Sequence, residues 1–380
     1  MRTWQKISFG LVVVLAAVSG ISPAQDEGPK KDVGETVAKP RKKDASAPDS
    51  DQPKIPSKLS NKNKADLPPE APSFKVDTSV VSVDVAVLDN KGHFIPGIPR
   101  GNFRILEDNV PQQISNFNTG NEAPMTVAMV IEFSNLFQQY WSEGWYQTLV
   151  AAYGFVETLK PEDYVAVVAY DMRPEILSDF TTDRQKTNEA MQRLRIAAFS
   201  ESNLYDALVD TAERMSGIEG RKAIVLLASG RDTFSKLTFD KTRKRIQEAG
   251  VPIYAIGLLQ ALREIMDSRG YMGPISRLDF LQADNQMNTF AKETGGQAFF
   301  PRFYGEFPGI YRAISDSLRN QYQLAYQPAN QARDGKYRKI KVELVNPATG
   351  EPLRIVDEKG KPMKYSVIAK AGYTAPNEVQ

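Results

Sequence analysis

The sequence contains no cysteine and only one histidine, His93, among its 380 residues. Without cysteine there are no disulfides, no zinc–thiolate sites, no cysteine nucleophile and no lipoprotein anchor. A single histidine excludes a multi-histidine metal site and leaves a Ser-His-Asp triad dependent on one residue in an expected turn. The net charge of +2 lacks the basic excess of a nucleic-acid-binding face, so we expect no nucleic-acid partner.

Long hydrophobic runs are equally scarce, and the longest is at the N-terminus. Arg2 and Lys6 precede an apolar stretch over residues 7–21, and the small residues at 22–24 suit a signal peptidase. About fifteen apolar residues are short for a membrane span. We predict that residues 1–24 are a cleaved signal peptide, with an uncleaved anchor as the alternative. The mature protein would then be periplasmic or extracellular, with no membrane span.

The next segment, residues 25–73, has no aromatic residue and is rich in proline, lysine and aspartate. Such a composition cannot bury enough apolar surface to offset the entropy of the chain, so it predicts a disordered linker. Beyond it, residues 81–87 alternate valine with small or polar residues, as a strand does, and residues 89–92 carry a hairpin-turn signal. We predict an N-terminal β-unit over residues 74–121.

Residues 122–318 follow a different pattern, in which short apolar runs alternate with helical segments. The expected strands are 127–131, 164–169, 175–180, 223–227, 253–257 and 297–300, and the expected helices are 136–159, 187–196, 204–215, 240–249, 288–293 and 310–318. This alternation predicts an α/β fold: a doubly wound, mostly parallel sheet with helices on both faces. Strand-like runs return in residues 319–376, a C-terminal β-unit that we expect to pair with the first unit into a small sandwich.

In a doubly wound sheet, ligands bind at the carboxyl ends of the strands. Neither a G-x-G-x-x-G motif nor a P-loop follows any expected strand, which argues against nucleotide binding. The first strand instead ends in Ile-Glu-Phe-Ser-Asn-Leu at 131–136, a helix begins after Ser-Glu-Ser-Asn at 200–203, and a later strand ends in Ala-Ser-Gly-Arg-Asp at 228–232.

These strand ends, in this order, resemble those of the von Willebrand factor type A domain family. The flanking segments 102–114, 321–326 and 371–373 are similar to secreted bacterial members of that family, described from acidobacteria. The resemblance implies one Mg²⁺ at the strand ends, held by Asp-x-Ser-x-Ser, a threonine and a second aspartate, with one position open for an acidic group of a partner. Hydroxyl, carboxylate and water oxygens are the ligands that this hard cation prefers.

Four of the five implied metal positions depart from the family pattern. Glu132 replaces the first aspartate, Leu136 a serine, Ser202 the threonine and Ser229 the second aspartate, whereas Ser134 matches. Mg²⁺ loses water reluctantly, and one carboxylate with two hydroxyls would compensate it poorly. We therefore expect no cofactor, with Mg²⁺ bound by Ser134, Ser202 and Glu132 as the alternative. Glu201, Asp171 and Asp232 are either substitute ligands or helix caps and solvated loop charges.

The start of the first expected helix is rich in aromatic residues, and Phe137, Trp141 and Trp145 share one face at helical spacing. This face either packs on the sheet or forms a contact patch that replaces the metal in recognition, since aromatic residues dominate interface hot spots.

These observations together predict a secreted or periplasmic binding protein, not an enzyme, that engages a protein or an envelope polymer through the strand-end face. The alternative is a structural component of an envelope complex that docks through its β-units. A hydrolase using Glu132 and Asp232 as an acid–base pair is a third interpretation, although the sequence offers neither a nucleophile nor an oxyanion site.

Overall fold

We describe the protein from a computed structural model. It describes residues 80–90, 92–119, 124–134, 149, 152–194, 201–270, 273–356 and 359–377. The predicted signal peptide and linker lie outside these ranges, and residues 74–380 form one compact unit. Within the described ranges, none of the helices has the length and apolar character needed to cross a membrane.

The central element is a six-stranded sheet with the order β10-β9-β8-β5-β6-β7. Its strands are β5 (Met125–Glu132), β6 (Tyr164–Tyr170), β7 (Pro174–Thr181), β8 (Arg221–Ala228), β9 (Ile253–Gly257) and β10 (Ala298–Phe299). All neighbours are parallel except the edge strand β7, which runs antiparallel to β6. Strand β5 has a neighbour on each side and is buried along its whole length, which explains its continuous apolar run.

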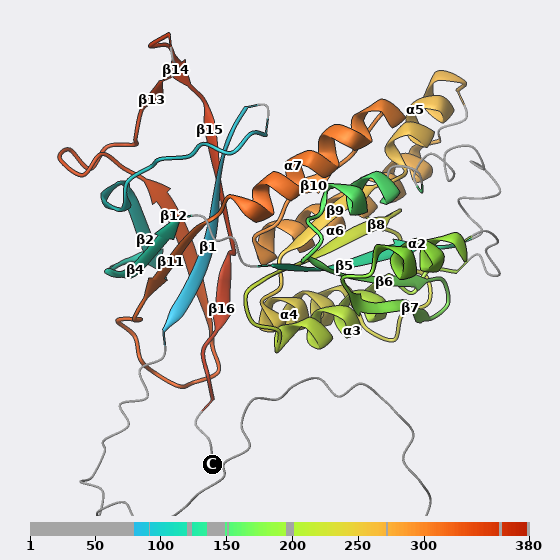
Figure 1. Cartoon of the computed structure of the whole chain (residues 1–380), viewed down its shortest axis with the longest axis horizontal. Coiled ribbons are helices and arrows are strands. Elements are labelled where there is room, and N and C mark those ends of the chain that lie inside the picture. The colour runs from blue at the N-terminus through green and yellow to red at the C-terminus, as the bar shows by residue number, and fades with distance from the viewer. Residues whose placement is uncertain are drawn as a thin grey trace, which may run out of the picture. The chain divides into compact units, whose positions relative to one another are not determined.

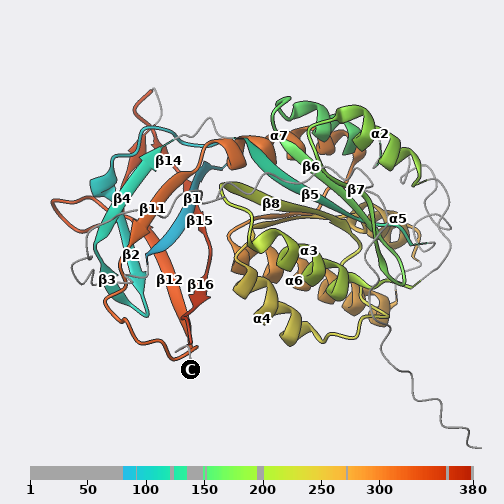
Figure 2. The ribbon, with the colours of Figure 1, turned by 60° about the horizontal axis from the view of Figure 1, so that its bottom comes forward.

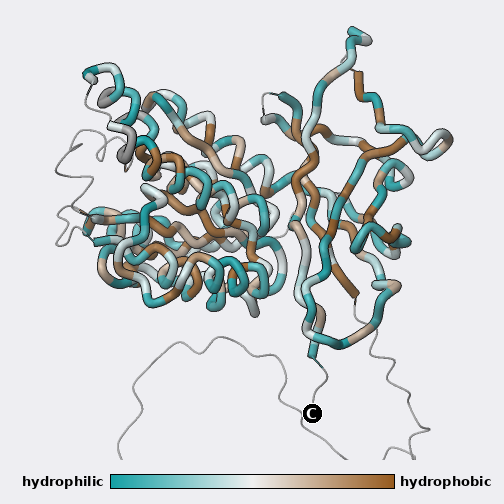
Figure 3. The backbone as a smooth tube through the Cα atoms, turned by 180° about the vertical axis from the view of Figure 1, so that it is seen from behind, coloured by the Kyte–Doolittle hydropathy of each residue, from teal (hydrophilic) through white to brown (hydrophobic). Residues whose placement is uncertain are grey.

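Helices cover both faces of this sheet (Figures 1 and 2). Alternate side chains of β5 enter two cores, one lined by α2 (Arg184–Gln192), α7 (Phe307–Arg319) and helical residues 152–158, and the other by α3 (Leu204–Ser216), α4 (Phe239–Ala249) and α6 (Pro274–Thr294). Figure 3 shows the hydrophobic residues concentrated between these layers. The predicted fold class is confirmed.

The flanking β-units form two packed four-stranded sheets. One sheet has the order β15-β1-β11-β4 and the other β16-β12-β2-β3. The strands are β1 (Val81–Asp89), β2 (Phe103–Glu107), β3 (Val110–Gln112), β4 (Ile114–Thr119), β11 (Tyr322–Tyr326), β12 (Tyr337–Leu344), β15 (Tyr365–Ala369) and β16 (Gly372–Thr374), with a separate hairpin of β13 (Ile355–Val356) and β14 (Pro362–Met363). Each sheet contains strands from both ends of the chain, for example in the pair Val83 and Leu324. The α/β domain is therefore inserted between the two halves of a sandwich.

The turn signal at 89–92 is confirmed, because Leu88 forms an antiparallel bridge with Phe94 and the Ile95 amide donates to the Val87 carbonyl at 2.8 Å. Two helices differ from the prediction. The expected short helix 288–293 is the end of the much longer α6, and α5 (Gln260–Ser268) was not expected at all. Leu278 and Leu281 of α6 are 64% and 53% exposed, so its first half lacks the apolar periodicity that marks a helix in sequence.

Candidate functional site

The carboxyl ends of β5, β6 and β8 meet at one edge of the sheet. Glu132 ends β5 opposite Tyr170 of β6, and Ile131 lies opposite Leu227 of β8. Because β5 lies between the other two strands, Glu132 projects at the centre of this edge. The structure brings four of the predicted site residues together here: Glu132, Ser134, Ser202 and Ser229.

The Glu132 side chain is fully buried and its carboxyl group accepts hydrogen bonds from three sides. The Ser134 hydroxyl donates to Oε1 at 3.1 Å, and the Ser229 amide donates to Oε2 at 2.7 Å. The Tyr170 hydroxyl also donates to Oε2, at 3.5 Å. Glutamate is long enough to reach the backbone at the end of β8, so this side chain cross-links the three strand ends.

Burial raises the pKa of Glu132 above its ordinary value of 4.5, although the hydrogen bonds from Ser229, Ser134 and Tyr170 act in the opposite direction. Burial also raises the pKa of Tyr170, with a further contribution from the charge of Glu132. Both shifts favour the neutral form of the pair in the folded protein.

The raised pKa predicts a pH-dependent stability. Below pH 4.5 Glu132 is protonated in both the folded and the unfolded chain and adds no pH dependence. As the pH rises above 4.5 the unfolded chain ionises first, so the free energy of unfolding falls until the pH passes the raised pKa of Glu132. We expect Glu132→Gln to remove this loss, so that urea unfolding between pH 4.5 and 8 shows the variant gaining stability over the parent with rising pH. If the unfolding free energies of the variant and the parent changed in parallel with pH, the raised pKa of Glu132 would be contradicted. The control is Glu162→Gln, at an exposed position.

Two loops next to Glu132 are bonded to each other. The Ser202 amide donates to Thr233 Oγ1 at 2.8 Å, and its hydroxyl donates to the Arg231 carbonyl at 2.9 Å. In return, the amides of Thr233 and Phe234 donate to the Ser202 carbonyl. The Ser229 hydroxyl accepts from the Arg231 amide. The serines at these positions therefore hold loop backbone in place.

Asp232, a candidate substitute ligand, lies at the N-terminus of α3. Its Oδ1 accepts from the Tyr205 amide at 3.2 Å and from the Ser235 hydroxyl at 2.5 Å. Burial raises the pKa of Asp232. This is the helix-cap alternative, because the carboxylate satisfies an amide that α3 leaves unpaired.

Sequence reasoning missed two residues of this network, Tyr170 and Thr233. Tyr170 is the last residue of β6 and lies opposite Glu132, so strand-end position was the available signal. Nothing in the sequence pairs Thr233 with Ser202, because the contact joins two loops.

The order of strands, the helices on both faces and the strand-end polar residues agree with a match to one family model. Residues 128–301 match the von Willebrand factor type A domain. This α/β domain has a von Willebrand factor type A-like fold. None of the curated proteins matches the chain.

Several solved structures resemble the chain at low identity. The proximal thread matrix protein 1 from the mussel byssus is 12% identical, with a TM-score of 0.42 over 56% of this chain and 51% of that one. The von Willebrand factor domain of the type V pili tip protein Mfa5 from Porphyromonas gingivalis is 15% identical, with a TM-score of 0.39 over 53% of this chain and 97% of that one. A von Willebrand factor type A protein from Catenulispora acidiphila is 12% identical, with a TM-score of 0.40 over 80% of this chain and 76% of that one. The chain thus spans about half the length of the mussel protein.

The strand ends of this type A-like domain do not fit the Mg²⁺ that the resemblance implies. Both oxygens of Glu132 accept hydrogen bonds, and the hydroxyls of Ser134 and Ser202 donate to protein acceptors. Nowhere in the described ranges do three histidine, cysteine, aspartate or glutamate side chains form a group that could hold a metal. A cation here would have to displace the Ser229 amide from a carboxyl group whose burial favours the neutral form.

The solvent side of this edge is polar but carries an exposed aromatic ring. A shallow cavity of about 200 Å³ lies between the loop after β8 and α6, and Arg231, Asp232, Asp279 and Gln286 are among its lining residues. Phe234, next along the loop, is 50% exposed. Leu136 and the proposed contact patch of Phe137, Trp141 and Trp145 lie outside the described residues, so the patch stays a prediction.

Proposed function

We propose that this protein is a secreted or periplasmic, non-enzymatic binding protein that engages a protein or envelope polymer through the strand-end face of its type A domain, without a metal ion. The observation that carries the proposal is the Glu132 carboxyl, which accepts hydrogen bonds from its own domain at the centre of that face. A metal-dependent type A domain leaves a coordination position for an acidic group of its partner. Because Glu132 is already hydrogen-bonded within its own domain, we expect the side chains around this edge to recognise the partner.

The burial of Glu132 also argues against the hydrolase interpretation. A general acid or base must come within hydrogen-bonding reach of its substrate. Glu132 has no exposed surface, and Asp232 is bonded to the start of α3. The two carboxyls that would form the acid–base pair thus have structural partners.

Aromatic side chains are the recognition elements that the proposal favours. Phe234 is half exposed on the loop that bonds to Ser202. The sequence predicts a helix over residues 136–159, directly after β5, so Trp141 is expected near the same edge. Aromatic residues contribute large contact areas at binding hot spots.

The test uses the full chain to capture partners from a cell-surface extract of the source organism, with and without EDTA. We expect capture to be unaffected by EDTA, and the variants Trp141→Ala and Phe234→Ala each to weaken the affinity for the captured partner. A hot-spot residue contributes about 2 kcal/mol or more, which corresponds to about a 30-fold loss.

Tyr164→Ala is the matched control, because Tyr164 is 45% exposed at the opposite end of β6. Its affinity should equal that of the parent. Calorimetric titration with Mg²⁺ and Mn²⁺ should give no binding heat. Heat that disappears in Ser134→Ala, or capture that needs Mg²⁺, would show that the metal site works and that the proposal is wrong.

A further inference from the structure

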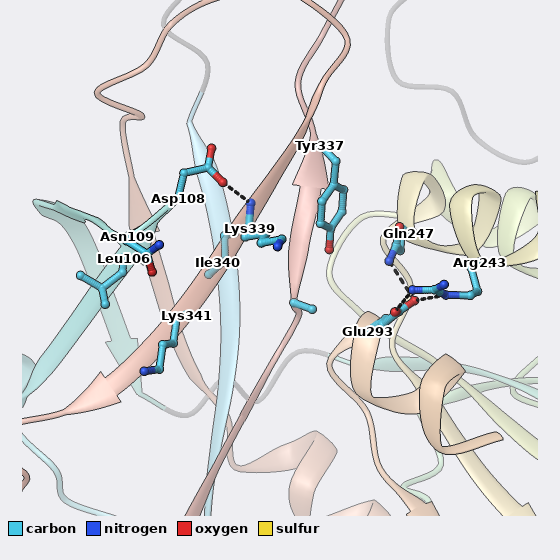
Figure 4. Close-up of a pocket in the computed structure, with 11 residues that line it drawn as sticks. Leu106, Asp108, Asn109, Arg243, Gln247, Glu293, Tyr337, Lys339, Ile340 and Lys341 are labelled. Carbon is cyan, nitrogen blue, oxygen red and sulfur yellow. Dashed lines mark hydrogen bonds and ion pairs between the residues drawn. The ribbon is translucent and has the colours of Figure 1, made fainter. Parts of the chain in front are cut away.

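A groove runs between the sandwich and helices α4 and α6, on residues that the strand-end face does not use. Its two parts have volumes of about 520 and 650 Å³ and share Ile340, Lys341 and Ala371, so they adjoin along β12. Volumes of this size are typical of ligand sites. Figure 4 shows the first part, with β12 on one wall and α4 and α6 on the other.

Cationic side chains dominate the lining of this groove. Five basic residues line its two parts, against the two acidic residues Asp108 and Glu293: Arg243, Lys292, Lys339, Lys341 and Lys370. The lining therefore carries three more basic than acidic side chains, and one of the basic ones, Lys341, pairs with Glu343 at 2.7 Å outside the lining.

Both acidic residues already accept hydrogen bonds from the protein. Glu293 accepts from Arg243 Nε at 3.0 Å and from Gln247 Nε2 at 2.9 Å, and Asp108 Oδ1 accepts from the Lys339 amide at 2.9 Å. By contrast, the ammonium groups of Lys292 and Lys339 form no ion pair with any residue in the described ranges. These two lysines are exposed and come from opposite walls, α6 and β12.

Neutral polar groups complete the lining. The Tyr337 hydroxyl is buried and has no hydrogen-bond partner among the described residues. Figure 4 shows the Tyr337 ring on the strand side of the groove, across from Gln247. A buried hydroxyl without a partner costs free energy, which a ligand hydroxyl would recover. Asn109, in the turn between β2 and β3 on the sandwich wall, adds an amide.

We propose that this groove binds an acidic polysaccharide, a polymer that offers both repeating anions and hydroxyl groups. The lysine ammonium group is a compact charge at the end of a flexible side chain. It can therefore pair with the repeating anions of a polymer whose geometry is not fixed. Single-stranded nucleic acid is less suited, because its bases stack on exposed aromatic faces. Tyr337 is the aromatic residue of the lining, and its ring packs on Gly372, where an added Cβ would lie 2.5 Å from Tyr337 Cζ.

The test measures binding of the full chain to polygalacturonate and heparin oligosaccharides, with neutral dextran and single-stranded DNA for comparison. We expect both acidic glycans to bind with an affinity that falls with salt, and dextran not to bind. The double variant Lys292→Gln/Lys339→Gln should weaken binding about tenfold, as expected for two exposed ion pairs. Tyr337→Phe should weaken it further without loss of stability.

The matched control is Lys186→Gln/Lys241→Gln, which removes the same charge from exposed positions on α2 and α4 outside the groove lining. It should bind within twofold of the parent, and Trp141→Ala should have no effect, which separates this site from the strand-end face. Equal weakening by both double variants, tighter binding of DNA than of either glycan, or no binding of acidic glycans at low salt would each overturn the proposal.

Discussion

Replacing Asp163 with alanine is expected to lower the free energy of unfolding by about 3–5 kcal/mol, the usual cost of removing one partner of a buried ion pair. The Asp163 side chain is fully buried at the start of β6. Its Oδ1 accepts from the Met125 amide at 2.9 Å, and its Oδ2 accepts from the Lys160 amide at 2.7 Å and from Arg319 Nη2 at 2.6 Å. Alanine would leave the Arg319 guanidinium and two amides without an acceptor.

Urea unfolding followed by circular dichroism measures this loss. Glu162→Ala is the control, because its contact with Lys160 is 3.9 Å long and both side chains are about half exposed. A surface pair of this kind contributes at most about 1 kcal/mol. If the two variants lost the same amount of stability, Asp163 would not hold β5, β6 and α7 together in the way we infer.

Replacing Gly230 with alanine is expected to destabilise the domain by at least about 2 kcal/mol and to disturb the strand-end face. Gly230 has a φ of +79°, which favours glycine. An added Cβ would lie 2.7 Å from the Ala283 carbonyl oxygen and 2.8 Å from the Met287 sulfur, both on α6. Because the backbone of α6 cannot shift without a large cost in free energy, the loop that carries Ser229 and Arg231 must move instead.

Gly217→Ala is the matched control for this prediction. Gly217 has a φ of −79° at the end of α3, and an added Cβ would meet nothing within 4 Å. Such a substitution stabilises by about 0.4–1 kcal/mol through the unfolded chain. We expect Gly230→Ala, but not Gly217→Ala, to lower both the melting temperature and the affinity for partners captured by the strand-end face. A Gly230→Ala protein as stable as the parent would refute the close approach of the loop to α6.

Local sequence pattern predicted most of the strands and helices correctly, where burial is one-sided or complete. The alternation over 81–87 and the apolar run at 127–131 became β1 and β5, because side chains on a strand alternate between faces. The pattern did not predict the first half of α6, where the exposed Leu278 and Leu281 interrupt the polar face. It did not predict α5 either. A helix on the rim of the domain leaves a weaker periodicity than one in the core.

At the candidate site, the sequence predicted that the strand ends carrying Glu132 and Ser229 would meet, but it did not predict the hydrogen bonds that these residues form. Parallel strands end at one edge, so Glu132 and Ser229 were expected near each other. That the Glu132 carboxyl accepts the Ser229 amide and the Tyr170 hydroxyl depends on side-chain direction and burial, which no spacing encodes. The metal-free state and the partner therefore stay predictions.

The sequence by itself determined the α/β class, the strand ends that meet at one edge of the sheet and the exclusion of cysteine and multi-histidine chemistry. These follow from periodicity and composition, which act over a few residues. Only the tertiary structure decided that Val83 pairs with Leu324, that Lys292 and Lys339 face one groove, and that Asp163 pairs with Arg319. Those contacts join residues far apart in the chain, and their free energy depends on burial that exists only once the whole unit has folded.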